Sequence, residues 1–522
     1  MAATTTGTQA GDLSGSLSNP VVPAIIRGEI VTSRLVEFHG RGDTISFLTP
    51  DPLIYVDRLP LDSPAGLADL YKLSFEDILD YLEELGHCLD IRSNEHMQWA
   101  RELTYATSHG TKPLIDNAFL SLNVEFNRER VRERAENTVG LGFLNGWVDT
   151  ALDGGRTISV RAFGARGLHI IPGNGPAAAA LTILRCAFLR SDCIIKTPSN
   201  GPFAAVAIGQ TMCEMAPDHP ITKHLAISYW RGGDAEIEQR ICQPHKIDKI
   251  IAWGGLASVR HVTRYIQPGL ELIALDPKSS ASVIGVEALM SDDKMREAAL
   301  RLAVDVGTGN QEPCSAARVA YVITGGIDED FSLITRLGEY VYEELMGLPI
   351  GLSSKPKSYD PELRSNIESI RLQDDFYKVF GGDEDEGCVV VSQLPDPVDF
   401  TSLLADRTVN IVPVETVNDV MTRFDAYTQT VGVFPESVRT DLIDVAPFYG
   451  VQRFVPLGYS SDHTGCAPHD GLELERRMCK WVVSQTKEPI PLTYAASRRG
   501  ASSLSDSYVP GTLDAVRGPD RD

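Results

Sequence analysis

Three absences in this chain exclude whole classes of protein. It carries 48 lysines and arginines against 71 aspartates and glutamates, a formal net charge of −23, so it lacks the basic surface of a nucleic-acid-binding protein. It has no run of 18 uninterrupted apolar residues, so we expect no membrane span. Residues 1–19 are rich in Thr, Gly and Ser and have neither the basic region nor the apolar core of a signal peptide. We therefore expect a cytoplasmic protein with a disordered N-terminus over 1–19.

The nine cysteines also lack the regular spacing of a disulfide framework, which favours free thiols in a reducing compartment. The chain is long, at 522 residues, and 43% of it is hydrophobic, enough for two or three domains with large cores. Residues 497–522 are polar and punctuated by Gly, Ser and Pro, so we expect a loose tail there.

From Thr157 onward, short apolar segments alternate with helical ones. The predicted strands are 168–171, 193–196, 224–230 and 249–253, and the predicted helices are 176–189, 202–215, 235–242 and 258–266. This alternation predicts a parallel sheet with helices on both faces, and such sheets bind ligands beyond the carboxyl ends of their strands.

The segments on either side of this region have patterns of their own. Before it we expect short strands over 21–55 and helices at 74–86, 94–105 and 113–137, the first capped by Ser74 and closed by Gly86. After it we expect a second α/β unit over 271–438. A return segment over 439–496 should follow, with an amphipathic helix over 472–483.

Ligand-type residues follow three of the predicted strands. These segments are Pro172-Gly-Asn-Gly-Pro176, Lys196-Thr-Pro-Ser199 and Trp253-Gly-Gly255. Glycines let a ligand approach the backbone, Asn174 offers an amide donor, and a lysine at the end of an apolar strand should point into the crevice. Each pattern alone is also typical of an ordinary turn.

Cys314 lies in the stretch around which these segments are organised, residues 305–322. Gly307, Gly309 and Asn310 before it favour a turn, and residues 317–323 read as a buried strand. A helix capped by Ser291 should precede the turn. Most cysteines are small buried hydrophobes. A cysteine in a loop held by a rigid framework is, however, a usual position for a nucleophile.

Together, and in this order, the segments resemble the aldehyde dehydrogenase superfamily, and more closely the LuxC-type acyl-CoA reductases, the fatty-acid reductase family. The motifs that carry the resemblance are IPGNGP (171–176), CIIKTPSNGPFAA (193–205), IAWGG (251–255), LDPKSSASV (275–283), NQEPC (310–314), VNIVPVETVNDVM (409–421) and PHDG (468–471). The resemblance implies an α/β, aldehyde-dehydrogenase-like fold. A Rossmann-type parallel-sheet cofactor domain would lie within 20–270, a second α/β catalytic domain within 271–438, and an oligomerisation segment within 439–496.

The resemblance also implies roles for individual residues. Cys314 would be the acyl-accepting nucleophile, and Asn174 would bind the oxyanion together with the backbone N–H of Cys314. The implied cofactor-binding residues are Lys196 and Ser199 at the adenosine ribose, and Pro172, Gly173, Gly254 and Gly255 along the rest of the cofactor. The implied partners are an acyl-CoA or acyl-protein thioester, an acyl-protein synthetase, and further copies of this chain in a homo-oligomer.

Two departures from the superfamily pattern refine this interpretation. Ala274 stands where hydrolytic aldehyde dehydrogenases carry a general-base glutamate, which favours acyl reduction over aldehyde oxidation; Asp276 or Glu312 remains open as a substitute base. Ser199 stands where NAD-preferring relatives often carry an acid, which favours NADPH as cofactor.

We therefore expect NADPH-dependent reduction of a fatty acyl thioester to an aldehyde, an oxidoreductase activity of EC class 1.2.1. The alternatives are an aldehyde dehydrogenase that makes free acid, and a catalytically silent scaffold that binds an acyl carrier. The segment from Asp462 to Asp470 also contains His463, Cys466 and His469, but the spacing H-x₂-C-x₂-H is not a standard zinc pattern. We expect a polar loop near the mouth of the active site there, and no metal.

Overall fold

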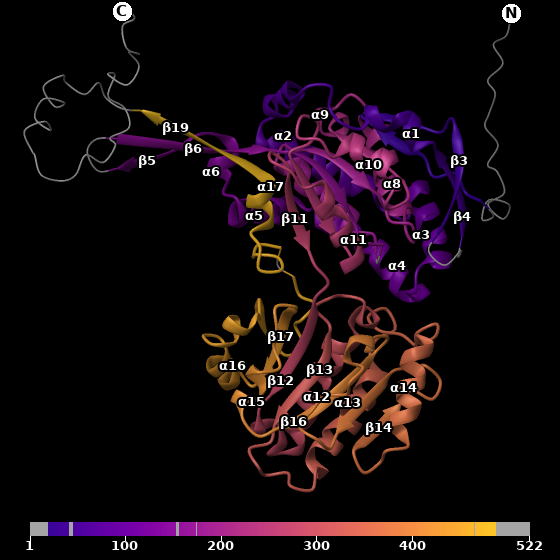
Figure 1. Ribbon diagram of the computed structural model, residues 1–522, viewed down its shortest axis with the longest axis vertical. Coiled ribbons are helices and arrows are strands. Elements are labelled where there is room, and N and C mark those ends of the chain that lie inside the picture. Colours follow the sequence, from indigo (N-terminus) through magenta and orange to yellow (C-terminus); the bar gives the residue numbers. More distant parts are fainter. Residues whose placement is uncertain (1–18, 41–44, 153–155, 174, 464, 487–522) are drawn as a thin grey trace, which may run out of the picture. The chain divides into compact units, whose positions relative to one another are not determined.

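The computed structural model describes residues 19–40, 45–152, 156–173, 175–463 and 465–486, which form two compact units (Figure 1). The larger unit lies within 1–145 and 162–480, and the smaller within 146–161 and 481–522. The predicted disordered N-terminus and loose tail lie outside the described residues, except for Asn19. No helix among the described residues is long and apolar enough to cross a membrane.

The first sheet of the larger unit has the strand order β11-β10-β7-β8-β9-β1-β2. Its parallel strands are β7 (Arg166–Ile170), β8 (Asp192–Lys196), β9 (Leu225–Ser228), β10 (Lys249–Trp253) and β11 (Glu271–Leu275), and β1 (Ala24–Ile26) and β2 (Glu29–Val31) extend it antiparallel. The chain builds outward from β7 to β9 and then crosses to β10 on the other side of β7. The point where the strand order reverses therefore lies between β7 and β10, where ligands bind in sheets of this kind.

Helices cover both faces of this sheet, as predicted. They are α7 (Ala177–Phe188), α8 (Phe203–Met215), α10 (Ala235–Ile241) and α11 (Leu256–Val262). Helices α10 and α11 share a buried cluster with Leu168, Ile194 and Ala226. Ile227 follows Ala226 in β9, so its side chain points to the opposite face of the sheet. Gly209 of α8 lies against Ile227, so α8 covers that opposite face.

The second sheet has the order β14-β15-β16-β13-β12-β17-β18, and only β14 runs antiparallel to its neighbour. The strands are β12 (Ser279–Ile284), β13 (Ala317–Ile323), β14 (Tyr377–Gly381), β15 (Cys388–Ser392), β16 (Thr408–Val414), β17 (Thr428–Phe434) and β18 (Arg453–Pro456). The covering helices are α12 (Asp292–Gly307), α13 (Ser332–Gly347), α14 (Pro361–Arg371), α15 (Val417–Met421) and α16 (Glu436–Leu442). The sheet thus extends past residue 438 through β18.

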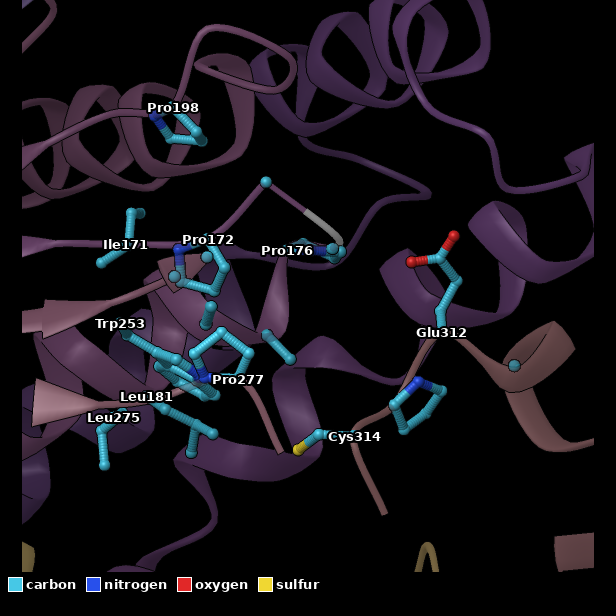
Figure 2. Close-up of a pocket in the computed structure, with 18 of the residues that line it drawn as sticks. Ile171, Pro172, Pro176, Leu181, Pro198, Trp253, Leu275, Pro277, Glu312 and Cys314 are labelled. Carbon is cyan, nitrogen blue, oxygen red and sulfur yellow. The ribbon is translucent and has the colours of Figure 1, made fainter. Parts of the chain in front are cut away.

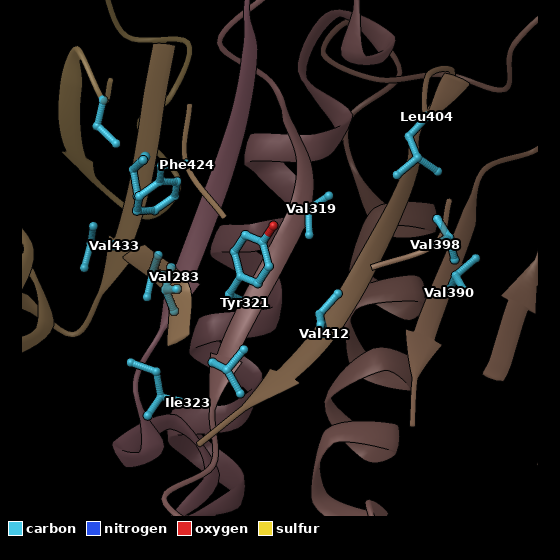
Figure 3. Close-up of a cluster of buried hydrophobic side chains, with 14 of the residues drawn as sticks. Val283, Val319, Tyr321, Ile323, Val390, Val398, Leu404, Val412, Phe424 and Val433 are labelled. Carbon is cyan, nitrogen blue, oxygen red and sulfur yellow. The ribbon is translucent and has the colours of Figure 1, made fainter. Parts of the chain in front are cut away.

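Alternate residues of these strands pack on opposite faces. Val389 and Val391 lie with α12 and α13, whereas Val390 joins the cluster under α14, α15 and α16 that is drawn in Figure 3. Each such fully buried valine or leucine contributes about 1.5–3 kcal/mol. Residues buried on both faces explain why these strands read as continuous apolar runs in the sequence.

The N-terminal segments confirm some predictions and correct others. Helix α2 (Phe75–Cys88) begins at Ser74 with the expected capping box, but it continues past Gly86. A Cβ on Gly86 would lie 2.8 Å from Cβ of Phe126, so this glycine allows close packing and does not end the helix. Helix α3 (Glu95–Thr107) and the strands β3 (Leu35–His39) and β4 (Ser46–Pro50) agree with the prediction. The remaining short helices are α1 (Pro52–Tyr55), α6 (Leu141–Asn145) and α9 (Pro220–Lys223).

The single helix predicted over 113–137 is wrong. The segment forms α4 (Lys112–Leu120) and α5 (Arg128–Thr138), separated by a 3₁₀ turn over 122–126. Leu122 and Phe126 of the turn are buried, and the side chain of Asn127 caps the second helix by accepting from the N–H of Arg130 at 3.1 Å. Tertiary burial of the turn and a new N-cap therefore divide the apolar pattern into two helices.

The amphipathic helix predicted over 472–483 is also wrong. Only α17 (Leu474–Met478) is helical, and β19 (Cys479–Thr486) follows at once. Strand β19 belongs to a three-stranded sheet of order β19-β6-β5, with β5 (Val148–Leu152) antiparallel to β6 (Arg156–Gly164). Trp481, Val482 and Val483 suit a pleated strand, and pairing with β6 outweighs the helical spacing of the apolar residues.

Candidate active site

A constrained loop holds Cys314 between α12 and β13, as the sequence predicts. Helix α12 is capped by Ser291, and three consecutive residues near its end, Gly309, Asn310 and Gln311, have φ of 61°, 52° and 67°. This left-handed backbone costs of order 1 kcal/mol or more for a residue other than glycine. The loop therefore needs side-chain hydrogen bonds to hold it.

The side chains of Asn310 and Gln311 supply these hydrogen bonds. Oδ1 of Asn310 accepts from the N–H of Ser354 at 2.9 Å. The Gln311 amide donates to the carbonyls of Ala317 at 2.7 Å and Thr408 at 2.8 Å, and its Oε1 accepts from the N–H of Thr408 at 2.9 Å. Both side chains are buried. They are thus structural residues that fix the Cys314 loop to β13 and β16.

The thiol of Cys314 is partly exposed and accepts a hydrogen bond from Nε2 of Gln429 at 3.1 Å. The backbone carbonyl of Cys314 accepts a hydrogen bond from Oγ of Ser280 at 2.8 Å. Burial raises the pKa of the Cys314 thiol, the carboxylate of Asp470 raises it further, and the hydrogen bond from Gln429 opposes both. The net pKa is raised, so the resting group is mainly a thiol at neutral pH.

One cavity of about 1920 Å³ brings Cys314 together with the strand ends singled out in the sequence (Figure 2). Its lining includes Pro172, Gly173, Lys196, Ser199, Gly254, Gly255 and Cys314. The first six lie at or just beyond the carboxyl ends of β7, β8 and β10, so they surround the point where the strand order reverses. Asn174, the predicted oxyanion donor, lies outside the described residues.

Lys196 ends β8 with only 9% of its surface exposed. Burial lowers the pKa of its ammonium group to about 8. Nζ lies 5.9 Å from the ring centroid of Tyr229 and 5.7 Å from that of Trp230. Among the described residues no group forms a hydrogen bond or ion pair with Nζ, so its charge is available to an anion in the cavity.

The glycines of the cavity differ in what they accommodate. A Cβ on Gly255 would meet no atom within 4 Å, and one on Gly254 would meet nothing nearer than Ser258 at 3.9 Å, so both leave space open for a ligand. A Cβ on Gly173 would lie 2.1 Å from Oδ1 of Asn200. A larger residue at position 173 would therefore require the Asn200 side chain to move.

Asp276 and Glu312, the two carboxylates left open as a general base, both line the cavity, and Ala274 lies in β11. Glu312 lies in the cavity wall, and partial desolvation by the surrounding atoms raises the pKa of its carboxyl. In Figure 2 the carboxylate of Glu312 and the sulfur of Cys314 point in different directions. This arrangement does not favour Glu312 as the base that activates water beside Cys314.

The segment 462–470 forms a polar part of the cavity wall. His463 and His469 line the cavity, and the ring of His469 lies 5.4 Å from that of Trp253. In the described part of the chain, the one group of His, Cys and acidic side chains close enough to share a metal is His169, Cys186 and Cys193, which does not line this cavity.

Sequence reasoning missed Gln429, Ser280 and Gln311, all of which fix or contact the Cys314 loop. Both strands begin with polar residues, SSAS in β12 and TQT in β17, and Ser280 and Gln429 are buried there. A buried polar residue needs a partner, which here is the Cys314 loop.

Comparison with known proteins agrees with this geometry. The model of the family described as acyl-CoA reductase (LuxC) matches residues 70–481. The chain belongs to the LuxC family. A long-chain acyl-protein thioester reductase of Aliivibrio fischeri is 26% identical over 317 residues, 60% of this chain and 63% of the relative. The corresponding protein of Photobacterium phosphoreum is 25% identical over 333 residues, 63% of this chain and 64% of the relative. The matched segment of this LuxC-family chain thus spans just under two thirds of these relatives.

Solved structures confirm the aldehyde-dehydrogenase-like fold of this LuxC-family chain. NADP-dependent glyceraldehyde-3-phosphate dehydrogenase from Bacillus halodurans, complexed with NADP, superposes with a TM-score of 0.68 at 13% identity and covers 89% of this chain and 99% of its own. Lactaldehyde dehydrogenase from Escherichia coli gives 0.65 at 13% identity, with coverages of 90% and 99%. At this identity the likeness shows the shared fold alone.

Proposed function

We propose that this protein reduces a fatty acyl thioester, either acyl-CoA or acyl-protein, to an aldehyde with NADPH. The observation that carries the proposal is the position of Cys314, which opens on the same cavity as the strand-end residues Lys196, Gly254 and Gly255. Membership of the LuxC family supports it, as do relatives named long-chain acyl-protein thioester reductases.

In the first step the Cys314 sulfur attacks the carbonyl carbon of the thioester. The tetrahedral oxyanion accepts hydrogen bonds from the backbone N–H of Cys314 and, in this proposal, from the side chain of Asn174. Collapse breaks the bond to the carrier sulfur, which leaves and takes a proton, and the acyl group remains on Cys314 as a new thioester. The thiol proton of Cys314 leaves before or during attack.

The residues of the cavity fit a nicotinamide dinucleotide. The open space at Gly254 and Gly255 suits a pyrophosphate close to the backbone, and Lys196 supplies a positive charge at the end of β8. Ser199 carries no charge that would repel a 2′-phosphate, so we infer NADPH as the cofactor. When bound, the nicotinamide supplies the hydride that reduces the acyl group on Cys314.

The acyl-enzyme must survive long enough to be reduced. Ala274 removes the superfamily's general base, and the carboxylate of Glu312 points away from the sulfur. Poor activation of water protects the thioester and supports reduction over hydrolysis to free acid. The synthetase partner, the homo-oligomer, the cytoplasmic location and the division near residue 270 into a cofactor domain and a catalytic domain complete the proposal and rest on the family resemblance and the sequence pattern.

Mass spectrometry of the intact protein tests the proposal. Mixing with a series of acyl-CoAs should add an acyl group that maps to Cys314, and NADPH should remove it with release of aldehyde. Cys314→Ala should abolish the adduct, and Cys88→Ala, which removes another partly exposed thiol, should keep it. If acyl-CoAs give no adduct but aldehyde with NADP⁺ loads Cys314, the donor is an acyl-protein. Failure of both routes, or steady production of free acid, would refute the proposed reaction.

A further inference from the structure

Gln429 contacts the reacting sulfur from the strand beside it. It lies in β17 with 4% of its surface exposed, and its Nε2 is 3.1 Å from Sγ of Cys314. The same nitrogen donates to Oδ1 of Asp470, in the PHDG segment to which the sequence assigned no role. The side chain of Asp470 is only 4% exposed. A buried amide thus joins a buried carboxylate to the nucleophile.

The surroundings of the Gln429 amide fix which end is nitrogen. An ionised carboxylate only accepts hydrogen bonds, so the group facing Asp470 must be the NH₂. The other end of the amide, Oε1, lies 3.4 Å from Oγ1 of Thr430. Oγ1 of Thr430 accepts a hydrogen bond from Nη1 of Arg453 at 3.4 Å, so the hydroxyl can donate its own hydrogen to Oε1 of Gln429. Of the two amide hydrogens, one serves Asp470 and the other points to the sulfur.

The hydroxyl of Ser280 holds Gln429 and Cys314 at this separation. Oγ of Ser280 in β12 accepts from the N–H of Thr430 at 3.2 Å and donates to the carbonyl of Cys314 at 2.8 Å. One side chain therefore ties β17 to the nucleophile loop, at the register shift between β12 and β17 next to Ser280. Gln429 and Cys314 are fixed with respect to each other by the sheet and not by a mobile loop.

We propose that Gln429 is a further catalytic residue, which donates a hydrogen bond to the Cys314 sulfur whenever that sulfur carries negative charge, and that Asp470 positions its amide. The inference rests on the proposed function in that Cys314 is the nucleophile. Negative charge is present on the sulfur before attack on the thioester. It appears again when the reduced intermediate releases aldehyde, because the carbon–sulfur bond then breaks, its electron pair returns to sulfur and the hydroxyl proton leaves.

Two neighbours of the sulfur act in opposite directions, which makes the inference testable. The amide of Gln429 stabilises the thiolate, and the carboxylate of Asp470 destabilises it. Among the described residues, the other charged side chains that interact with the thiol are Arg318, on β13, and Arg453, on β18, and Nδ1 of His469 lies 3.6 Å from Oδ2 of Asp470. All three remain in every variant below. A role confined to packing would not give opposite shifts for two substitutions at adjacent positions in space.

The experiment measures the rate at which iodoacetamide alkylates Cys314 in the full chain as a function of pH, by peptide mass spectrometry. Gln429→Leu should move the midpoint upward and slow alkylation at pH 7.5 about tenfold or more, the usual worth of a hydrogen bond to a charged group. Asp470→Asn keeps an oxygen to accept from Gln429 and removes the charge, so the midpoint should move downward. Gln98→Leu removes a half-buried glutamine that donates to the carbonyl of Ile91 and should leave the midpoint unchanged.

The outcomes separate this inference from the proposed function. If wild-type Cys314 is not alkylated at any pH, the proposed nucleophile fails. If wild-type Cys314 is alkylated and Gln429→Leu follows the same pH curve, the role of Gln429 is overturned and the proposed function stands. Should Gln429→Leu fail to fold, Gln429→Met keeps the length of the side chain and removes the N–H donor from the sulfur. Its midpoint should then rise above that of wild type, and an unchanged curve would equally overturn the inference.

Discussion

Raising the pH from 7 to 9 should weaken NADPH binding about tenfold, because Lys196 loses its charge over this range. Burial lowers the pKa of Lys196 to about 8. The Lys196 side chain is therefore charged in roughly nine tenths of the molecules at pH 7 and in about one tenth at pH 9. The charged form is the one that attracts the cofactor, so affinity falls as pH rises through the pKa. A 2′-phosphate, with its second pKa near 6, stays dianionic throughout.

Calorimetric titration of the full chain with NADPH at pH 7, 8 and 9 measures this dependence. Lys196→Arg keeps its charge at every pH, so its dissociation constant should stay flat up to pH 9. Lys196→Met should bind weakly at all three values. NADH lacks the 2′-phosphate, and its affinity should depend less on pH.

The comparison between wild type and Lys196→Arg shows whether Lys196 causes the loss of NADPH affinity at high pH. If both lose affinity in parallel as pH rises, another group titrates and Lys196 is not the source. If wild type, arginine and methionine variants bind NADPH equally at every pH, Lys196 does not contact the cofactor, and the assignment of the β8 end to the ribose phosphate is wrong.

Three further substitutions test neighbouring parts of the structure. Ser199→Asp should shift preference from NADPH toward NADH by about tenfold or more in the ratio of KM values, since the new carboxylate repels a 2′-phosphate. Gln311→Leu leaves buried backbone groups of Ala317 and Thr408 without their partner, at about 1–3 kcal/mol each, and should lower the Tm and slow alkylation of Cys314. Glu475→Gln leaves the buried Arg185 guanidinium without the carboxylate that lies 2.7 Å from it, and chemical denaturation should show a loss of about 3–5 kcal/mol in stability. Replacing both Arg185 and Glu475 by methionine should restore much of that loss.

Much of the fold could be predicted because its signals are local. Strand β13 has the predicted bounds, Ala317–Ile323, and α12 is capped by the predicted Ser291. Both depend on a few adjacent residues: an apolar, partly β-branched run in one case and a hydroxyl followed by two acids in the other. The common location of the strand-end residues also follows, because parallel strands bring their carboxyl ends to one edge.

The failures occur where a distant partner decides the local conformation. Cys479–Thr486 has apolar residues at helical spacing, yet it becomes a strand because β6, at Arg156–Gly164, offers it an edge. The segment 113–137 divides where Leu122 and Phe126 enter the core. The edge of β6 and the core around Leu122 and Phe126 are formed by residues distant in sequence. The spacing of apolar residues alone therefore predicts a helix in the first segment and a single unbroken helix in the second.

Cys314 and its hydrogen-bond donor Gln429 show the same limit within one site. Cys314 is found from its own loop, but Gln429 lies 115 residues further along the chain and reaches the sulfur only through sheet register. Strand β17 must pair with β12, with a shift near Ser280, and a slip of one residue would turn Gln429 to the opposite face. A donor of this kind becomes visible in a sequence once the strand order is known. A buried polar residue in the strand on the far side of β12 from β13 is then the first position to examine, because a buried polar group needs a partner and the Cys314 sulfur is within reach.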